Sequence, residues 1–309
     1  MGSEGIFDKY INPYTDFGFK LLFGTDLNKD LLISFLNALL QGKETIESIS
    51  YLNTEHLGTQ ELDRKAVFDV YCTNEKGERF LVEMQKGEQR FFKDRSVYYA
   101  TYAIREQAPK GEWDYELKAV YAVCVLNFTF PDTDNSVIQP VQLMNVRTKQ
   151  VFYDKLTFIY LEMPKFDKEV EELETMLDKW LFVLKNLSRL MDRPVALQER
   201  IFTRLFDTAE IARFDRKEYL EYEESLKNLR DWYSMQKTAR TEGKEEGHKE
   251  EKIETALKML KKGLDFELIS ELTGLSMEDV NKLQEQNGIN ITSRRKNSCN
   301  RKNGTGTAC

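Results

Sequence analysis

The feature that most constrains the fold is an almost unbroken apolar run, LKAVYAVCVLNFTF, at residues 117–130. Such a run is typical of a strand buried on both faces, which requires further layers of structure above and below the sheet. Before it, residues 92–107 have the pattern of a helix that is ended by Pro109 and Gly111. The preceding segment, KAVFDVYCTNEKGERFLVEMQ, has the Val, Phe and Tyr content and the central glycine of a β-hairpin. Strand, helix and strand in this order predict an α/β layer.

Helices are predicted on both sides of this segment. Near the start, LNKDLLISFLNALLQG follows Asp26, a good N-cap, and stops at Gly42, a good C-terminal breaker. The apolar side chains of its predicted helical stripe are Leu27, Leu31, Leu32, Phe35, Leu39 and Leu40. A strand is predicted near ESISYLNTEH. From about Asp167 onward, apolar residues recur at spacings of three and four, which predicts a helical subdomain packed on the α/β part.

Farther along, residues 239–263 predict a charged, solvated helix or linker, and DFELISELTGLSMEDVNKLQ predicts two short helices about the turn TGLS. The second of these helices carries Glu278, Asp279 and Glu285 against Lys282. That is the wrong sign for a helix that faces phosphates in a DNA groove. A module for packing or interaction is therefore favoured over a DNA-binding helix-turn-helix, and these C-terminal helices are the surface through which we expect any homo-oligomer to form.

Composition excludes several classes of protein. With 41% hydrophobic and 31% charged residues, the chain has the make-up of a folded globular protein. No apolar run approaches the roughly 20 residues of a membrane-spanning helix, and the N-terminus lacks the basic and apolar regions of a signal peptide. Two histidines and four cysteines without CxxC spacing do not predict a zinc site. We expect a cytoplasmic protein with no membrane partner.

The formal net charge of −7 conceals an asymmetry. Residues 291–309 carry five basic residues and no acid, so residues 1–290 sum to −7 − 5 = −12. The charge of the chain therefore does not by itself indicate nucleic-acid binding. The basic tail is polar and low in apolar content, and we expect it to be disordered.

The turn of the predicted hairpin sets the register of its two strands. NEKGE resembles a three-residue loop with Gly77 in the left-handed conformation, which would pair Asn74 with Glu78. Counting back from that pair sets Asp69 opposite Glu83. Directly opposed residues have Cβ atoms about 4.5–5.5 Å apart, where like charges repel unless something positive lies between them. Two carboxylates that converge in this way suit a hard divalent cation such as Mg²⁺, which takes oxygen ligands.

Other polar side chains share these faces. Alternation puts Lys65 on the side of Asp69, and it puts Gln85 on the side of Glu83 and opposite Val67. A solvated face is the simpler interpretation, because charged strand residues usually face water. Alternation alone favours that interpretation, so a metal site needs more specific support.

The more specific support is a resemblance. An Asp on one strand followed, after a short turn, by Glu-x-Gln resembles the core of PD-(D/E)XK nucleases. The wider chain, outside the C-terminal tail, is similar to the Rpn family of recombination-promoting nucleases and transposases. The matching segments, in order over residues 8–286, are NPYTDFGFKLLFG, DRKAVFDVYC, GERFLVEMQK, FFKDRSVYYATYAIREQAPKGEWDYELKAVYAVCVLNF, EGKEEG and ISELTGLSMEDVNKL. The resemblance implies an α/β fold: a restriction-endonuclease-like core with a mixed β-sheet flanked by helices, followed by a C-terminal helical region.

We also expect the chain to divide into four parts. The nuclease-like core would span residues 1–165, and a helical subdomain would span 166–236. A charged helix and a small helix-turn-helix-like hairpin would follow at 237–290, with the disordered basic tail at 291–309.

The chemistry that the resemblance implies is carried by few residues. Asp69 and Glu83 would hold Mg²⁺, with the backbone carbonyl of Met84 as a third ligand. Gln85 stands where the wider superfamily has its lysine. Because glutamine is neither a cation nor a general base, it would orient water or a phosphate oxygen by hydrogen bonding. The metal would lower the pKa of bound water and stabilise charge on the scissile phosphate of DNA.

Another lysine could take the place of the missing one. Lys65 lies on the face of Asp69, and Lys20 belongs to the matching N-terminal motif DFGFK. We rank both above Lys86, which alternation points to the opposite face. Asp16 and Lys20 are four residues apart, so a surface ion pair on a helix is the alternative for them.

The predicted helix after the hairpin carries Arg95, Tyr99 and Tyr102 on one face, with Arg105 farther along. Arg95 could grip a phosphate with two hydrogen bonds, and the tyrosines could line the substrate path. The simpler interpretation makes the tyrosines core residues and makes Arg95 the partner of an acid of the hairpin. We prefer the simpler interpretation for Tyr102, and keep Arg95 and Tyr99 as substrate-binding candidates.

The resemblance implies a Mg²⁺-dependent DNA endonuclease linked to recombination or mobile-element functions. The alternative is a catalytically weak or silent nuclease-like protein that acts by binding DNA or a protein partner. Retention of Asp69 and Glu83 favours the enzyme, whereas Gln85 and the acidic body of the chain favour the alternative. A transposase that joins DNA strands is a third hypothesis, because an acidic metal site does not separate strand transfer from hydrolysis.

Overall fold

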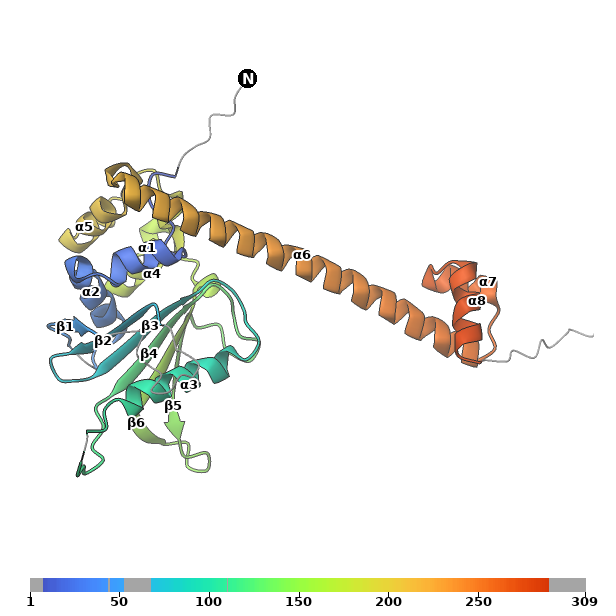
Figure 1. Cartoon of the computed structure of the whole chain (residues 1–309), viewed down its shortest axis with the longest axis horizontal. Coiled ribbons are helices and arrows are strands. Elements are labelled where there is room, and N and C mark those ends of the chain that lie inside the picture. Colours follow the sequence, from blue (N-terminus) through green and yellow to red (C-terminus); the bar gives the residue numbers. More distant parts are fainter. Residues whose placement is uncertain (1–7, 44, 53–67, 110, 289–309) are drawn as a thin grey trace, which may run out of the picture. The chain divides into compact units, whose positions relative to one another are not determined.

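The computed structural model describes residues 8–43, 45–52, 68–109 and 111–288, and its centre is a six-stranded mixed sheet (Figure 1). The strands are β1 (Ile49–Tyr51), β2 (Val70–Asn74), β3 (Arg79–Gln85), β4 (Val120–Leu126), β5 (Ile138–Met144) and β6 (Val151–Glu162). Their order across the sheet is β1-β2-β3-β4-β6-β5. β3 is parallel to β4 and β4 is parallel to β6, whereas the other neighbouring pairs are antiparallel.

The helices follow the sequence prediction in outline. They are α1 (Asp16–Phe23), α2 (Lys29–Leu39), α3 (Phe92–Arg105), α4 (Met176–Asn186), α5 (Arg200–Ala209), α6 (Arg216–Lys261), α7 (Phe266–Thr273) and α8 (Met277–Gln286). Single 3₁₀ turns are η1 (Asp26–Asn28), η2 (Met163–Lys165), η3 (Val170–Glu172), η4 (Leu187–Arg189) and η5 (Ile211–Arg213). The predicted order of strand, helix and strand is confirmed, because α3 connects the parallel strands β3 and β4.

The apolar run that dominates the sequence forms β4, and every residue of that strand is buried. β4 lies between β3 and β6, and it is parallel to both. A central parallel strand is covered on both faces, so it has no face left for polar side chains. The predicted strand buried on both faces is therefore confirmed.

Each face of the sheet has its own hydrophobic core. On one face, Phe80, Val82 and Met84 of β3 join a core built with α1, α2, α4 and α5. The fully buried ring of Trp180 lies in this core against aromatic rings of α1, α2 and α5. On the other face, Leu81 and its neighbours pack against α3. Figure 1 shows α3 on one side of the sheet and the other four helices on the opposite side.

These cores define one compact unit, which spans Met1–Asp231. Helices α4 and α5 follow residue 166, yet they share a core with α1 and α2. The boundary expected at residue 165 therefore follows the order of elements along the chain and does not separate two cores.

α2 begins later than predicted. Asp26 opens a 3₁₀ turn, and the α-helix begins at Lys29, after Asn28. Leu27 is 79% exposed, so its predicted place in the buried stripe is wrong. The reason is that a 3₁₀ turn has three residues per turn, which rotates Leu27 away from the α-helical stripe that follows.

The hairpin of β5 and β6 was not predicted. β5 is an edge strand, contains Pro140 and is largely exposed. A proline is tolerated at an edge because no neighbouring strand needs its missing N–H. The first half of β6 is also exposed, and its buried part begins at Thr157. Strands that are exposed along most of their length lack the alternating apolar residues from which a strand is predicted.

The second compact unit spans Trp232–Cys309. Its described part has a small core made of Ala256, Leu260, Ile269 and Val280. α7 ends at Gly274, which has a φ of 67°, and the Ser276 side chain caps α8 by accepting from the Asp279 N–H. The two predicted short helices about the turn TGLS are confirmed. The tail at 291–309, expected to be disordered, lies outside the described residues.

α6 runs without interruption from Arg216 to Lys261. The end of the predicted helical subdomain and the charged helix or linker predicted at 239–263 are therefore largely one element. Charges on neighbouring turns pair along it, as Lys258 does with Glu254 at 2.6 Å. Within the part of the chain that the structure describes, no helix combines the length and the apolar character that crossing a membrane requires.

The glycine of the motif DFGFK is required by packing. A Cβ at Gly18 would lie 2.4 Å from the carbonyl oxygen of Asn12 and 2.7 Å from Oγ1 of Thr15. Thr15 uses that oxygen to cap α1, accepting from the Gly18 N–H at 3.0 Å. We expect Gly18→Ala to lower the free energy of unfolding by about 1–3 kcal/mol, as overpacking of a close contact does. Urea unfolding followed by near-ultraviolet circular dichroism measures this.

The matched control is Gly243→Ala in α6, where an added Cβ would meet nothing within 4 Å. Alanine is the better helix former, so this variant should be as stable as the wild type or more stable by about 0.5–1 kcal/mol. Equal unfolding midpoints for Gly18→Ala and the wild type would contradict the packing role of Gly18.

Candidate active site

The hairpin of β2 and β3 has the predicted register. The Asn74 N–H donates to the Glu78 carbonyl at 3.0 Å, and the Gly77 N–H donates to the Asn74 carbonyl at 3.1 Å. Gly77 has a φ of 79°, which is the left-handed conformation that this loop needs. The paired ladder continues to Val70 opposite Val82.

Asp69 and Glu83 are the next positions of this register, one step beyond the paired ladder. The Asp69 carboxylate turns toward β3, because its Oδ2 accepts a hydrogen bond from the Met84 N–H at 2.8 Å. The negative charge of Asp69 raises the pKa of Glu83, so the two carboxylates lie within electrostatic reach of each other. The hairpin thus brings these two predicted site residues together.

Burial raises the pKa of Asp69. The hydrogen bond from Met84 opposes this rise, and the negative charge of Asp16 adds to it. The positive charges of Lys20 and Lys86 lower the pKa of Asp69. α1, which carries Asp16 and Lys20, therefore supplies charged neighbours to the end of the hairpin.

Glu83 is paired with Arg95 of α3. Nη2 of Arg95 lies 2.6 Å from Oε1 of Glu83 and donates a second hydrogen bond to Oε1 of Gln85 at 2.7 Å. Nη1 of Arg95 donates to Oε1 of Gln89, in the turn between β3 and α3. The simpler interpretation of Arg95, as the partner of a hairpin acid, is confirmed.

The pKa of Glu83 is raised to about 7, and desolvation is the main cause. The guanidinium of Arg95 works against this rise, whereas the charge of Asp69 adds to it. Arg95 itself lies over the rings of Phe92 and Tyr99, at 5.2 and 5.5 Å from their centroids. Its Nε is buried and has no hydrogen-bond partner among the described residues.

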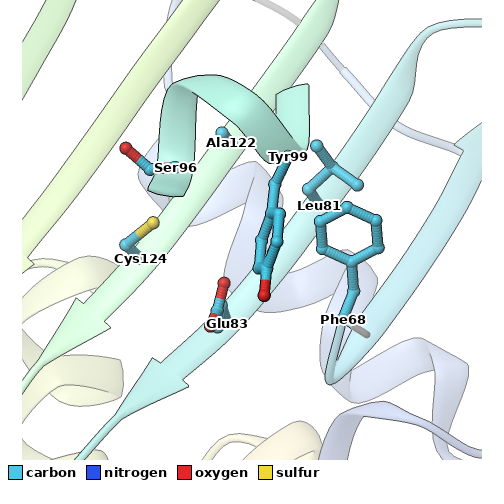
Figure 2. A pocket seen from close by; sticks show the side chains of 7 residues that line it. All are labelled: Phe68, Leu81, Glu83, Ser96, Tyr99, Ala122 and Cys124. Atoms are coloured by element: carbon cyan, nitrogen blue, oxygen red, sulfur yellow. The ribbon is translucent and has the colours of Figure 1, made fainter. Parts of the chain in front are cut away.

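A small cavity beside Glu83 explains its desolvation. Figure 2 shows the Glu83 carboxylate on β3 and the ring of Tyr99 descending from α3, with its hydroxyl toward Glu83. The remaining lining residues are Phe68, Leu81, Ser96, Ala122 and Cys124. The cavity volume is about 10 Å³, which leaves room for about one water molecule. The lining is mainly apolar and the Glu83 side chain is only 15% exposed, so bulk water reaches little of this carboxylate.

Gln85 is buried and does not face open solvent. Its Nε2 donates to the Gly87 carbonyl at 3.0 Å, and its Oε1 accepts from Arg95. The side chain therefore holds both the turn that follows β3 and the guanidinium that neutralises Glu83.

The structure describes two of the three candidate lysines, Lys20 and Lys86. Lys86 lies just past the end of β3, and its partner Asp16 belongs to α1, which packs on the face of Met84, so Lys86 points to the face that alternation predicted. Its Nζ pairs with Oδ1 of Asp16 at 2.8 Å, and its charge reaches Asp69. Within the described residues, Asp16 thus pairs with Lys86 and not with Lys20. Lys65, and with it Val67 opposite Gln85, lies outside the described residues.

The two tyrosines of α3 that were predicted to share a face, Tyr99 and Tyr102, have different surroundings. Tyr99 lines the cavity, whereas Tyr102 is 5% exposed and belongs to the core under α3, which confirms the simpler interpretation. Sequence reasoning missed Gln89, which binds Arg95 from a turn that carries no recognisable pattern. It also missed Phe91, the N-cap of α3, although an aromatic residue at an N-cap is an uncommon choice that could have been noticed.

The donor set fits a hard divalent cation. The carboxylates of Asp69 and Glu83, with the backbone carbonyl at Met84, are oxygen donors of the kind that Mg²⁺ accepts. Within the described residues, no third Asp, Glu, His or Cys joins them to form a metal-binding group. The remaining ligands would therefore be water or substrate oxygens, which suits an ion that usually keeps several waters.

The raised pKa of Glu83 predicts how stability depends on pH. The unfolded chain loses this proton near pH 4.5, whereas folded Glu83 keeps it until about pH 7. The folded state therefore binds more protons in this window, and the contribution of Glu83 to stability falls as the pH rises. The free energy of unfolding of Glu83→Gln, measured against the wild type by urea unfolding, should gain up to about 3 kcal/mol between pH 4.5 and 7. Parallel pH profiles would contradict this.

The C-terminal unit also matches a known family. Residues 249–285 match the family model described as the C-terminal HTH domain of the Rpn/YhgA-like nuclease family. The preference for a packing module over a helix-turn-helix is therefore wrong as regards the motif. The acidic charge of α8 limits which surface of the motif could contact phosphates, but it does not determine whether the helices fold as a helix-turn-helix.

The main comparison concerns the larger unit. No curated protein and no solved structure matches the chain. Residues 13–239 match the family model described as PD-(D/E)XK nuclease family transposase, and this span contains α1, the β2–β3 hairpin and α3. The match covers well over half of the chain, and the mixed sheet flanked by helices agrees with a restriction-endonuclease-like fold. The chain therefore belongs to the PD-(D/E)XK nuclease family of transposases.

Proposed function

We propose that the protein is a Mg²⁺-dependent DNA endonuclease that acts in the cytoplasm and serves recombination or mobile-element functions. The observation that carries the proposal is the meeting of Asp69 and Glu83 where the hairpin opens, in the order that the family motif requires. Two carboxylates kept close together in a desolvated place are costly for the fold. Such an arrangement supports a functional site more than a structural one.

Asp69, Glu83 and the carbonyl of Met84 would hold the ion. When bound, it would lower the pKa of a ligated water and stabilise negative charge on the scissile phosphate. Lys20 supplies positive charge beside Asp69 without an ion pair among the described residues. Lys65 remains a second lysine candidate on the basis of the sequence alone. Gln85 would keep Arg95 and the turn after β3 in place.

Arg95 would have two roles. With no ion bound, its guanidinium neutralises Glu83. When the ion takes over that carboxylate, Arg95 is left with donors for a phosphate oxygen, since a guanidinium presents five N–H groups in a fork. Tyr99 lies beside both groups and would line the path of the substrate.

Plasmid nicking tests the assignment of the site. Purified full-length protein should nick supercoiled DNA with Mg²⁺ and not with EDTA, and Asp69→Ala should lower the nicking rate at least about 100-fold, because loss of a metal ligand removes several kcal/mol of charge stabilisation. Asp192→Ala, at a well-exposed acid, is the matched control and should nick like the wild type. Equal nicking by the Asp69→Ala protein and the wild type would refute the assignment.

The two described lysines can be separated by the same assay. Lys20→Ala should slow nicking by about tenfold or more, because its charge acts on Asp69 and would stabilise charge on the phosphate. Lys86→Ala should have the smaller effect, since its Nζ is already held by Asp16. A Lys86→Ala protein that is slower than Lys20→Ala would reverse this assignment.

A protein that binds DNA or another protein without cleaving is the second candidate function. Gln85 in the lysine position and the pairing of Arg95 with Glu83 favour it. A wild type that folds, binds DNA and never nicks it with Mg²⁺ would establish this candidate. Joined DNA products, rather than nicked ones, would instead indicate strand transfer.

The C-terminal unit would add DNA binding or self-association to either function. Its match to an HTH domain supports the first. Leu268 and Leu272, four residues apart and both exposed on α7, support homo-oligomerisation through the C-terminal helices.

A further inference from the structure

The outer face of α3 carries a row of side chains that face away from the core under the helix. Tyr98 and Arg105 are seven residues apart in α3, so they follow one another along one side of the helix at an interval of about 10 Å, and Phe91 is the N-cap residue at the start of the helix. Phe91 is 66% exposed and Tyr98 is 46% exposed, and Arg105 is exposed as well. With Arg90, which precedes Phe91, these residues form what we call the α3 row.

Phe91 occupies an unusual place for an aromatic residue. Its backbone is left-handed, with φ 64° and ψ 30°, which bulky side chains rarely adopt. The guanidinium of Arg90 lies 4.9 Å from the centroid of its ring. The strained backbone thus presents an aromatic ring to solvent with a positive group beside it.

The start of the α3 row is tied to the candidate active site. The Phe91 carbonyl accepts from the N–H of Arg95 at 3.0 Å, and the Arg95 side chain reaches Glu83. Gln89, two residues before Phe91, also binds Arg95. A nucleic-acid strand held by Phe91 would therefore lie within one helical turn of Arg95, which we assign to binding a phosphate.

The far end of the row is also aromatic and basic. Tyr98 and Tyr102 meet edge to face, and their hydroxyls hydrogen-bond to each other. The guanidinium of Arg105 lies 5.3 Å from the centroid of the Tyr102 ring. Tyr98, Thr101, Tyr102, Ile104 and Arg105 line a shallow hollow at this end. The α3 row thus has a guanidinium beside an aromatic ring at each end.

We propose that the α3 row binds an unpaired segment of a nucleic-acid strand and leads it to the Asp69–Glu83 site. The inference rests on the proposed function, because it specifies the class of DNA that this site would accept. Unpaired bases stack on aromatic rings and on guanidinium planes, and arginines neutralise the phosphates between them. A regular duplex keeps its bases stacked inside and offers such a surface little more than its backbone.

The charge and spacing of the row favour this occupant over a protein partner. The two exposed rings are seven residues apart, and the exposed Asp94 lies between them in sequence, so they do not form one continuous apolar patch. Arg90 and Arg105 complement a polyanion. Asp94 and Glu88 are each three residues from the row's first ring and both are exposed, and each opposes a phosphate backbone. Removing the charge of Asp94 should therefore tighten nucleic-acid binding, whereas removing a ring of the row should weaken it.

Binding of a fluorescein-labelled 20-nucleotide single strand and of the matching duplex, by fluorescence anisotropy in EDTA, tests the proposal without cleavage. The full-length wild type should bind the single strand. Phe91→Asn removes the ring and keeps a residue that tolerates the left-handed backbone. Phe91→Asn and Tyr98→Ala should each weaken single-strand binding roughly 5- to 150-fold, as the loss of one stacked base does, and should change duplex binding less than about twofold.

The controls use the same assay. Phe152→Ala removes a ring that is 80% exposed on β6 and should leave binding unchanged. Asp94→Asn should tighten single-strand binding, because it removes a repelling charge. Phe91→Tyr should retain the wild-type affinity, because it keeps an aromatic face.

The proposal would be overturned if the wild type did not bind the single strand, or if both Phe91→Asn and Tyr98→Ala kept the wild-type affinity for it. It would also be overturned if these variants lost affinity equally for the duplex and the single strand. A fourth such result is unchanged affinity in these variants together with the loss of a dimer, measured by light scattering. The last would assign the row to a second copy of the chain. Failure of the proposed function would look different, because the wild type would then bind the single strand through Phe91 and Tyr98 yet fail to nick DNA with Mg²⁺.

Discussion

The contact between Glu83 and Arg95 determines how the site is built. The Glu83 carboxylate lies among apolar side chains, and a charge taken out of water needs a positive partner nearby. Arg95 supplies that charge from α3 and reaches Gln85 and Gln89 as well, so one guanidinium fastens the helix to β3 and to the turn between them. The same contact explains why Tyr99 lies over the cavity, because it follows Arg95 by one helical turn.

Local charge and total charge give different impressions of this protein. Residues 1–290 carry a formal charge of −12, because −7 − 5 = −12, yet Lys20 and Lys86 act on Asp69 while Arg95 acts on Glu83. Salt screens charges beyond about 8–10 Å, so a phosphate near the site would respond mainly to these close neighbours. An acidic surface elsewhere is compatible with DNA binding at a site where three cations lie beside the acids, and it restricts where on the molecule that binding can occur.

Much of the fold followed from patterns that depend only on neighbours in the chain. The apolar run of β4, the spacing of α3 and the turn glycine of the hairpin each predicted its element, and the register of β2 and β3 followed from the loop length. The edge hairpin of β5 and β6 escaped because a strand that faces water has no apolar alternation, and Leu27 was misplaced because a 3₁₀ turn breaks the helical phase. The partner of Arg95 was only one of two open alternatives, since sequence spacing cannot show what lies across from a helix.

The sequence by itself determined the register that faces Asp69 toward Glu83, because turn geometry and side-chain alternation act over a few residues. It also determined the family, through several motifs in a constant order. Only the tertiary structure decided which positively charged side chains lie near Asp69 and Glu83. Lys86, just past the end of β3, binds Asp16 of α1, the charge of Lys20 on α1 acts on Asp69, and Arg95 of α3 binds Glu83. Those contacts join elements far apart in the chain, so they depend on how the layers pack on the sheet and not on local spacing.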